Sequence, residues 1–310
     1  MSTVSAIPII YNPAAKSARS SHREAQLSAL SPRVQLVPTT CAGDATRIAT
    51  ELVQEGATTI VAAGGDGTIN EVVKGIAACG DAAKDVHLGV LPVGTANVFA
   101  QELGLPMLEM GLPGLGMHRC WKIIESGATR RVDVWTGNDM PFIQLAGIGF
   151  DAAVINETSW EQKKIAGPLS YLMNAVRIFG ESHENVTVTS NALAAPLQGA
   201  FVLIGNGQRY GGPMRFFPEA ANDDGLLDVM VFKKQEIPAL LKFFAAVGTG
   251  QIPKSGNDFE FFRCHSLDIS AEGQVPFELD GELCGTTPVA IRHAGTINVK
   301  VPAKKSNVDL

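Results

Sequence analysis

The chain has 310 residues, of which 45% are hydrophobic and 18% charged, and its formal net charge at pH 7 is −6. A chain of this length and composition buries a sizeable core, and two domains are expected. The negative charge argues against a nucleic-acid partner, because binding to a phosphate backbone needs a basic surface.

No apolar run approaches the roughly 20 residues that span a bilayer, and the N-terminal residues lack the basic and apolar regions of a secretory signal. A cytoplasmic location is therefore expected, which leaves room for transient contact with a membrane surface through a local basic and apolar patch. The five cysteines are scattered and never form a C-x-x-C pair, so we expect reduced thiols rather than disulfides or a zinc site.

The first part of the chain alternates short β-branched runs with amphipathic stretches, a pattern that favours βαβ units. It predicts an α/β nucleotide-binding domain with a doubly wound, mostly parallel sheet. The expected strands cover residues 7–11, 34–37, 59–63 and 88–91, and the expected helices cover 21–30, 44–55 and 69–78.

From about residue 130 the pattern changes to alternating strands separated by turn residues, which favours antiparallel pairing. Expected strands cover 132–134, 142–145, 200–204, 226–232, 267–269 and 277–279, with helices over 162–179 and 237–247. We therefore predict an α/β domain over residues 1–128 and a mainly antiparallel, sandwich-like β domain over 129–310, with the last strand allowed to return to the first domain.

A glycine-rich turn follows the expected strand 59–63. Glycines let main-chain N–H groups approach a phosphate without a Cβ clash, and the N-terminus of the following helix adds positive potential. The turn matches neither G-x-x-x-x-G-K-[ST] nor G-x-G-x-x-G. A phosphate site is predicted over Gly65, Asp66, Gly67, Thr68, Ile69, Asn70 and Glu71.

A second loop, 91–97, also follows a buried strand and carries Thr95. Ligands of open α/β sheets bind beyond the carboxyl ends of strands, so both loops are expected to line one crevice. Asn12 and Thr40 follow two further strands. For these two residues, helix capping or turn formation is as good an interpretation as ligand contact.

The chain resembles the diacylglycerol kinase catalytic-domain family, which includes sphingosine and ceramide kinases and soluble bacterial lipid kinases, in an ordered set of motifs. These are G-G-D-G-T-I-N-E (64–71), L-P-V-G-T-A-N (91–97), G-I-G-F-D (147–151), G-N-G (205–207), N-D-D-G-L-L-D-V (222–229) and L-D-G-E (279–282). The resemblance implies a kinase that uses ATP and Mg²⁺ to phosphorylate a lipid hydroxyl, with the active site between a nucleotide domain and a β-rich lipid-binding domain.

The resemblance also implies roles for individual residues. Asn12, Thr40, Gly65 through Glu71 and Thr95 would contact the nucleotide, and Asp66 would reach the catalytic Mg²⁺ directly or through water. Asp224, with main-chain oxygens near Ala221 and Leu226, would hold a structural Mg²⁺. Asp280 and Glu282 would be the catalytic carboxylates.

These roles leave alternatives open. Asp280 can accept the proton of an attacking hydroxyl, with Glu282 as the competing candidate, but Asp280-Gly281 also has the sequence of an ordinary hairpin turn. Asp223-Asp224-Gly225 equally suits a plain turn. Val98 stands where many relatives carry an acidic residue, which puts the detailed metal network in doubt.

The sequence indicates less clearly how the lipid substrate is bound. Residues 160–179 join a basic start to an apolar stretch that suits either membrane docking or packing on a sheet. The competing functions are a NAD kinase- or phosphofructokinase-like enzyme with a soluble substrate, and a non-catalytic lipid-binding protein of the same fold. A homodimer remains possible, and the sequence does not identify the lipid.

Overall fold

The computed structural model describes residues 6–13, 20–107, 115–149, 184–210, 214–234, 236–251 and 255–303. The chain divides into two compact units. Unit 1 contains Met1–Val134 and Gly295–Leu310, and unit 2 contains Trp135–Ala294. The boundary that the sequence predicts after residue 128 falls six residues before this division. The predicted helix over 162–179 lies outside the described residues.

Unit 1 is built on a parallel sheet with the strand order β2-β1-β3-β4. The end of β16 (Val289–Val301) adds a further parallel pairing to β4 at Asn298 and Val299. Strands of such sheets are covered on both faces and therefore read as continuous apolar runs. The strands are β1 (Ile7–Tyr11), β2 (Val34–Pro38), β3 (Thr59–Gly64) and β4 (His87–Pro92).

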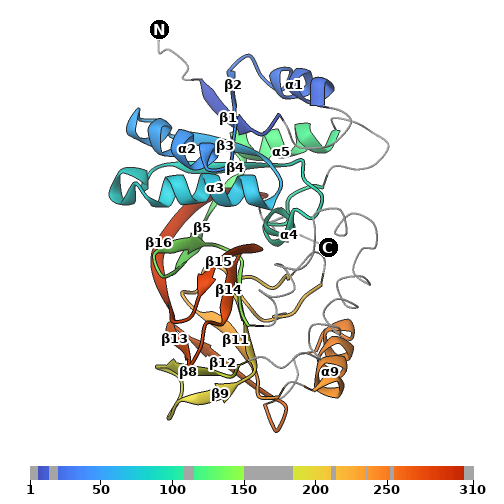
Figure 1. Cartoon of the computed structure of the whole chain (residues 1–310). Coiled ribbons are helices and arrows are strands. Elements are labelled where there is room, and N and C mark those ends of the chain that lie inside the picture. The colour runs from blue at the N-terminus through green and yellow to red at the C-terminus, as the bar shows by residue number, and fades with distance from the viewer. Residues whose placement is uncertain are drawn as a thin grey trace. The chain divides into compact units, whose positions relative to one another are not determined.

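Helices lie against both faces of this sheet (Figure 1). Small residues bring the layers together: Gly75 lies against Thr46 and Ala49 of the neighbouring helix, and Gly89 lies against Ile124. The helical segments are α1 (Ser20–Ser28), α2 (Asp44–Gln54), α3 (Asp66–Ala77), the short 3-10 helix η1 (Gly80–Ala83), α4 (Val98–Glu102) and α5 (Leu115–Ser126).

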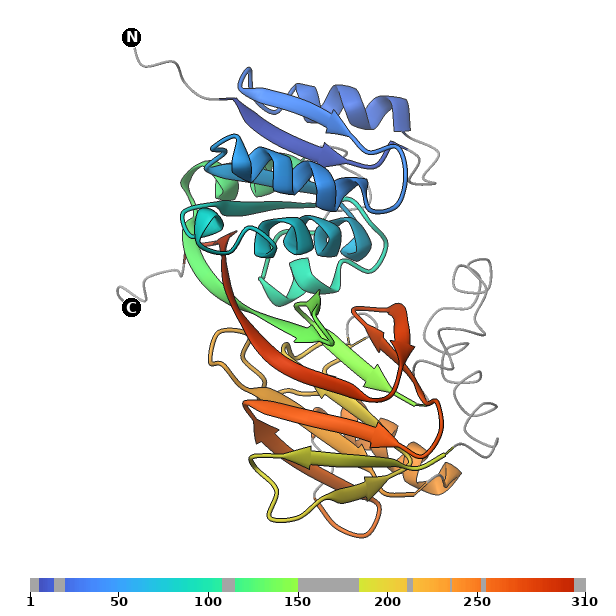
Figure 2. The same ribbon diagram turned by 60° about the vertical axis from the view of Figure 1, so that its left-hand side comes forward.

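Unit 2 contains a six-stranded antiparallel sheet with the order β12-β11-β10-β7-β14-β15. Further antiparallel pairings join β13 to β8 and to β16, β8 to β9, and β5 to β6. In Figure 2 the orange strand β13 lies beside the olive strands β8 and β9. The elements are β5 (Ala128–Gly137), β6 (Met140–Phe142), β7 (Leu145–Ile148), β8 (Val186–Ser190), β9 (Leu197–Gly199), β10 (Phe201–Gly205), β11 (Leu227–Phe232), α9 (Ile237–Gly248), β12 (Phe259–Cys264), β13 (Ser266–Ala271), β14 (Pro276–Leu279) and β15 (Glu282–Thr286).

The central strands of the six-stranded sheet, β7, β10 and β11, are buried on both faces. Successive side chains of a strand point to opposite faces, and β10 shows this directly. Val202 and Ile204 join the core shared with β8 and β13, whereas Phe201 and Leu203 join a second core under α9. The expected antiparallel, sandwich-like domain is confirmed, as is the α/β fold of unit 1.

One predicted strand is wrong. Residues 142–145 do not form a continuous strand, because β6 ends at Phe142 and β7 begins at Leu145. The main-chain N–H groups of Ile143, Gln144 and Leu145 instead donate to the carboxylate of Asp280. A side chain distant in sequence therefore interrupts the strand, which no local pattern reveals.

Candidate functional site

The predicted nucleotide-binding residues of unit 1 come together at one edge of the parallel sheet. Asn12 follows β1, Thr40 follows β2, Gly65 follows β3 and Thr95 follows β4. The strand order reverses direction at β1 and β3, which makes this edge the topological switch point where ligands of open α/β sheets bind. Four segments far apart in sequence thus meet at one candidate ligand site.

The two glycine loops at this edge pack backbone against backbone. A Cβ added to Gly94 would lie 2.3 Å from the Cα of Gly65, closer than real Cβ atoms approach. The N–H of Val93 donates to the carbonyl of Gly64 at 3.1 Å, which joins the two loops. Glycine is therefore required at position 94 by the neighbouring loop itself. A surface made of main-chain atoms is suited to phosphate.

Asp66 links the first glycine loop to helix α4. It is the first residue of α3, and its Oδ1 accepts the N–H of Phe99, in the first turn of α4, at 3.1 Å. Burial raises the pKa of Asp66, while the main-chain donors from residues 97–99 act in the opposite direction. The carboxylate is thus held in place at the sheet edge where the phosphate site is predicted.

Asp66 fits the Mg²⁺ ion that the kinase family implies. This cation is usually bound by one or two carboxylates together with phosphate oxygens and waters. No group of three or more acidic, histidine or cysteine side chains that could hold a metal occurs among the described residues. An Mg²⁺ ion that arrives with a nucleotide would be held by the half-buried Asp66 together with the phosphates.

The remaining α3 residues differ in accessibility. Gly67 is exposed and Thr68 half-buried, whereas the side chains of Ile69 and Asn70 are buried, with Asn70 only 2% exposed. Neither amide atom of Asn70 has a hydrogen-bond partner within the described part of the chain. The side chains of Ile69 and Asn70 are therefore out of reach of a ligand in this structure, although both were predicted to contact the nucleotide.

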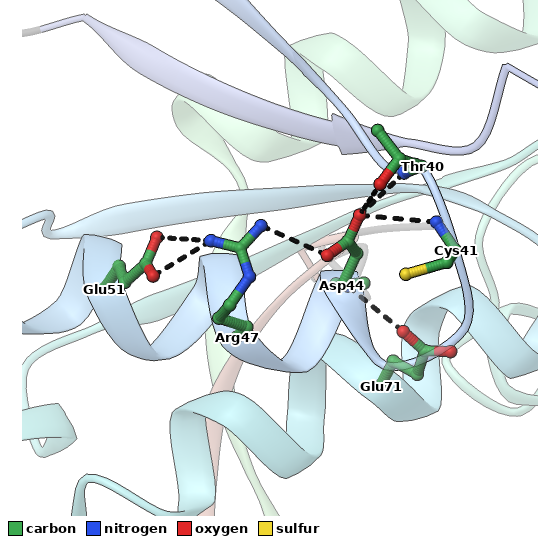
Figure 3. Close-up of polar contacts among 7 residues, drawn as sticks. Thr40, Cys41, Asp44, Arg47, Glu51 and Glu71 are labelled. Carbon is green, nitrogen blue, oxygen red and sulfur yellow. Dashed lines mark hydrogen bonds and ion pairs between the residues drawn. The ribbon is translucent and has the colours of Figure 1, made fainter.

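Thr40 is exposed, but its hydrogen-bonding groups are engaged in the loop before α2 (Figure 3). Its hydroxyl donates to Oδ2 of Asp44, and its N–H donates to the same oxygen at 2.7 Å. Oδ2 also accepts the N–H of Cys41. Arg47 donates to Oδ1 of Asp44 at 3.1 Å and to Glu51. These donors hold the pKa of Asp44 well below its usual range, the hydroxyl of Thr40 contributing most.

Glu71 ties α3 to α2. Its Oε2 accepts the N–H of Ala45 at 3.1 Å (Figure 3), and its carbonyl accepts the hydroxyl of Thr46 at 3.0 Å. These contacts give Glu71 a structural role at the N-terminus of α2. Thr95, in contrast, is exposed and lies in the second glycine loop.

In unit 2, Asp280 and Gly281 form the two-residue turn between β14 and β15. Both have left-handed backbone angles, with φ of 51° and 84°, as a two-residue Asp-Gly hairpin requires. Oδ2 of Asp280 accepts the N–H of Ile143, and Oδ1 accepts those of Gln144 and Leu145, each at 2.9 Å. The hairpin interpretation is thus confirmed, and the turn holds a carboxylate whose charge three main-chain donors stabilise.

Glu282 is the first residue of β15 and is exposed. It stands two residues after Asp280, so the turn presents two carboxylates close together in sequence, one fixed by main-chain donors and one accessible to solvent.

The predicted structural metal site has a different environment. Oδ1 of Asp224 accepts the N–H of Leu226 at 3.0 Å, and Oδ2 contacts the guanidinium of Arg263 at 2.5 Å. Arg263 also donates to the fully buried Asp228 at 3.1 Å. A guanidinium already neutralises Asp224, so a cation would have to displace it. An Mg²⁺ ion at Ala221, Asp224 and Leu226 would therefore compete with Arg263 for the Asp224 carboxylate.

The sequence analysis missed one buried acid beside the Asp280 turn. Glu278 is fully buried, and its Oε2 accepts the N–H of Gly281 at 2.7 Å. The available signal was its position between Phe277 and Leu279, since an acid within an apolar strand is uncommon unless it is paired.

Comparison with known proteins gives a consistent result. Residues 6–136 match the model of the diacylglycerol kinase catalytic domain, and residues 145–301 match the YegS C-terminal NAD kinase beta sandwich-like domain. The chain is 32% identical over 250 residues to a "Probable lipid kinase YegS-like" of Chromohalobacter salexigens, an alignment that covers 78% of this chain and 75% of that protein.

Two further relatives extend this similarity. The chain is 30% identical over 272 residues to a "Diacylglycerol kinase" of Staphylococcus carnosus, covering 87% of this chain and 85% of the relative. The solved structure of a "putative diacylglycerol kinase" from Bacillus anthracis superposes with a TM-score of 0.77 at 26% identity, covering 96% of this chain and 97% of the other.

Proposed function

Because this chain belongs to the diacylglycerol kinase family of lipid kinases, we propose that it transfers the γ-phosphate of ATP to a hydroxyl group of a diacylglycerol-like lipid in an Mg²⁺-dependent reaction. Kinase activity toward an alcohol group follows from the family. The nucleotide, the metal and the lipid class are the parts that we propose.

The close packing of Gly65 on Gly94 is the observation that carries the nucleotide assignment. Two loops without side chains at this contact follow neighbouring parallel strands at the switch point of the sheet. Main-chain N–H groups and a helix N-terminus suit the polyphosphate of ATP. Thr95 is the accessible side chain that can add a hydroxyl contact, and Asn12 lies exposed at the end of β1.

Mg²⁺ would be held by Asp66 together with the phosphates, and when bound it neutralises charge that develops on the transferred group. Asp66 needs its charge for this role, whereas its contact with Phe99 needs only an acceptor oxygen. Phosphoryl transfer requires little covalent chemistry from the protein, so fixed positions of these groups account for most of the expected rate enhancement.

We assign proton acceptance from the lipid hydroxyl to Asp280, with Glu282 as the alternative. The three N–H donors fix the orientation of the Asp280 carboxylate. Glu282 is the more exposed of the two side chains.

Among the described residues, no helix has the length and apolar character needed to cross a bilayer. We therefore propose that the lipid is reached by transient contact with the membrane surface. Residues 160–179, which the sequence analysis singled out for this contact, lie outside the described residues.

The test is a phosphoryl-transfer assay with radiolabelled ATP and Mg²⁺. Diacylglycerol, phosphatidylglycerol and a sphingoid base are supplied in mixed micelles, with NAD and fructose 6-phosphate as soluble acceptors. We expect labelled product from a lipid alone. Product from NAD or fructose 6-phosphate would overturn the lipid assignment, and ATP binding without any product would favour the non-catalytic alternative. Gly65→Val, which should lose ATP affinity, is the control for the site.

A further inference from the structure

Glu278 is a carboxylate on strand β14, which is buried on both faces at Phe277, Glu278 and Leu279. Its neighbours Phe277 and Leu279 point into the core between the two sheets of unit 2. Glu278 therefore faces the opposite side of the six-stranded sheet, where Tyr210 and Phe216 pack in the second core. The side chain is 0% exposed, and a buried carboxylate is costly unless it is hydrogen-bonded. Its contacts show what the acid is used for.

Both oxygens of Glu278 are engaged by residues of the turn and of a neighbouring segment. Oε2 accepts the N–H of Gly281 at 2.7 Å, and Oε1 accepts the hydroxyl of Tyr210 at 3.1 Å. Gly281 is the residue between Asp280 and Glu282. Glu278 therefore fixes the peptide that joins the two candidate catalytic carboxylates.

The other side of the same turn is fixed through Gln144. The N–H of Gln144 donates to Asp280, and its carbonyl accepts the N–H groups of Asn206 and Gly207 at 3.0 and 3.3 Å. Its side-chain Nε2 donates to the carbonyl of Arg209 at 3.1 Å. The segment 206–209 is thus hydrogen-bonded to Gln144, and the N–H of Gln144 donates to Asp280.

Tyr210 closes this network into a ring. It directly follows residues 206–209, and its hydroxyl reaches Glu278, so the ring runs from Asp280 through Gln144 and Tyr210 to Glu278 and back through Gly281. Tyr210 is itself held in place, because its N–H donates to the carbonyl of Met214 at 3.0 Å and its ring stacks on Phe216 at 4.8 Å between centroids.

We propose that Glu278 and Tyr210 are positioning residues that hold the Asp280-Gly281-Glu282 turn in the geometry needed for phosphoryl transfer. This inference rests on the proposed function of the turn. Neither residue needs to contact the substrate: Glu278 acts on Gly281, and Tyr210 acts on Glu278. A two-residue turn anchored from both sides has little freedom, and a misplacement of about 1 Å can cost a factor of about 10² in rate.

Two conservative variants test the proposal in the full-length protein. Glu278→Met keeps the length of the side chain but removes both acceptor oxygens, so the contacts with Gly281 and Tyr210 are both lost. Tyr210→Phe removes only the hydroxyl. We expect kcat to fall about 10- to 100-fold in Glu278→Met and less in Tyr210→Phe, while the KM values for ATP and lipid stay within about twofold.

The double variant tests whether the two residues act in series. If Tyr210 acts through Glu278, the double variant should be no slower than Glu278→Met alone, because effects of coupled residues do not add. Independent, multiplicative losses would overturn the ring. Val231→Ala, in the core of the same sheet, is the matched control for lost stability: it should lower the unfolding temperature and leave kcat unchanged well below that temperature.

Amide hydrogen exchange provides a readout that does not depend on the substrate. The N–H of Gly281 should be protected in the wild type and exchange at least 10-fold faster in Glu278→Met and in Tyr210→Phe, with the amide of Val231 unchanged. Equal protection of Gly281 in all three proteins, or normal kcat in folded Glu278→Met, would overturn the proposal. If the wild type phosphorylates no lipid while Gly281 behaves as expected, the proposed function fails and the anchoring of the turn stands.

Discussion

The carboxylate of Asp66 accepts the N–H of Phe99 at 3.1 Å, which joins the first turn of α3 to the first turn of α4. This contact and the proposed metal role make separate demands on the side chain, because the first needs an oxygen and the second a charge. Asp66→Asn keeps one acceptor oxygen and should therefore lower the unfolding temperature less than Asp66→Ala does, while both variants should lose the Mg²⁺ dependence of ATP affinity. Calorimetric titration with ATP, with and without Mg²⁺, and thermal unfolding measure the two effects.

The contact between Gly94 and Gly65 predicts different outcomes at the two positions. A Cβ at Gly65 meets the Cα of Gly94 at 3.4 Å, an ordinary contact, whereas one at Gly94 meets Gly65 at 2.3 Å. Gly94→Ala should therefore destabilise unit 1 by about 1–3 kcal/mol, as overpacking typically does. Gly65→Val should remain folded but lose most of its ATP affinity. Unchanged ATP affinity in folded Gly65→Val would move the nucleotide site elsewhere.

Two neutral variants, Asp280→Asn and Glu282→Gln, show which of the two carboxylates accepts the proton of the lipid hydroxyl. Asp280→Asn should lower turnover by about 10² to 10⁴ through loss of the proton acceptor. It should also destabilise the protein by about 1–3 kcal/mol, because its NH₂ group would face an N–H donor of Ile143, Gln144 or Leu145. Glu282→Gln should leave stability unchanged. Normal turnover in Asp280→Asn together with an inactive Glu282→Gln would transfer the base role to Glu282.

The environment of Asp44 predicts how acid affects stability. The donors from Thr40 and Arg47 lower the pKa of Asp44 in the folded protein, so its contribution is complete above its unfolded pKa of about 3.9 and declines as the pH falls below that value. The difference in unfolding temperature between the wild type and Asp44→Asn should therefore be larger at pH 7 than at pH 3. A difference that stays constant between these pH values would show that the charge of Asp44 is not what stabilises the loop.

Arg263 predicts that unit 2 does not depend on a metal. It bridges Asp224 and the fully buried Asp228, so the unfolding temperature of the nucleotide-free protein should be the same in Mg²⁺ and in EDTA. Arg263→Gln should destabilise by about 3 kcal/mol, because it leaves a buried carboxylate without its partner. Lys242→Gln, which breaks an exposed pair with Asp258, should cost less than about 1 kcal/mol. Stabilisation of the wild type by Mg²⁺ that Asp224→Ala abolishes would restore the metal site.

The fold of unit 1 was largely predictable because its signals are local. Apolar runs ended by Asn12, Gly56 or the glycine turn mark strands and helices within a few residues. The sequence analysis missed helix α5, although Cys120, Trp121 and Ile124 have helical spacing. In unit 2 the break between β6 and β7 depends on Asp280, more than 130 residues away, and could not be read from neighbouring residues.

In the candidate site, too, local motifs were predictable from the sequence and long-range contacts were not. Motifs identified the loops, because glycine and acidic residues at fixed spacing have few structural uses. They did not show that Glu71 binds α2, that Asn70 is buried or that Arg263 occupies the place expected for a cation. Each of these depends on which side chains the fold brings together, and a sequence pattern contains that information only indirectly.

The return of β16 to unit 1 has a consequence for synthesis of the protein. Strand β4 of the parallel sheet in unit 1 pairs with Asn298 and Val299, which follow all of unit 2 in the sequence, and Asn298 also donates to the carbonyl of Lys84 at 2.7 Å. Until those residues leave the ribosome, β4 is an apolar strand with an open edge, which is a template for wrong pairing and aggregation. The sheet of unit 1 is thus completed only after all of unit 2 has been synthesised.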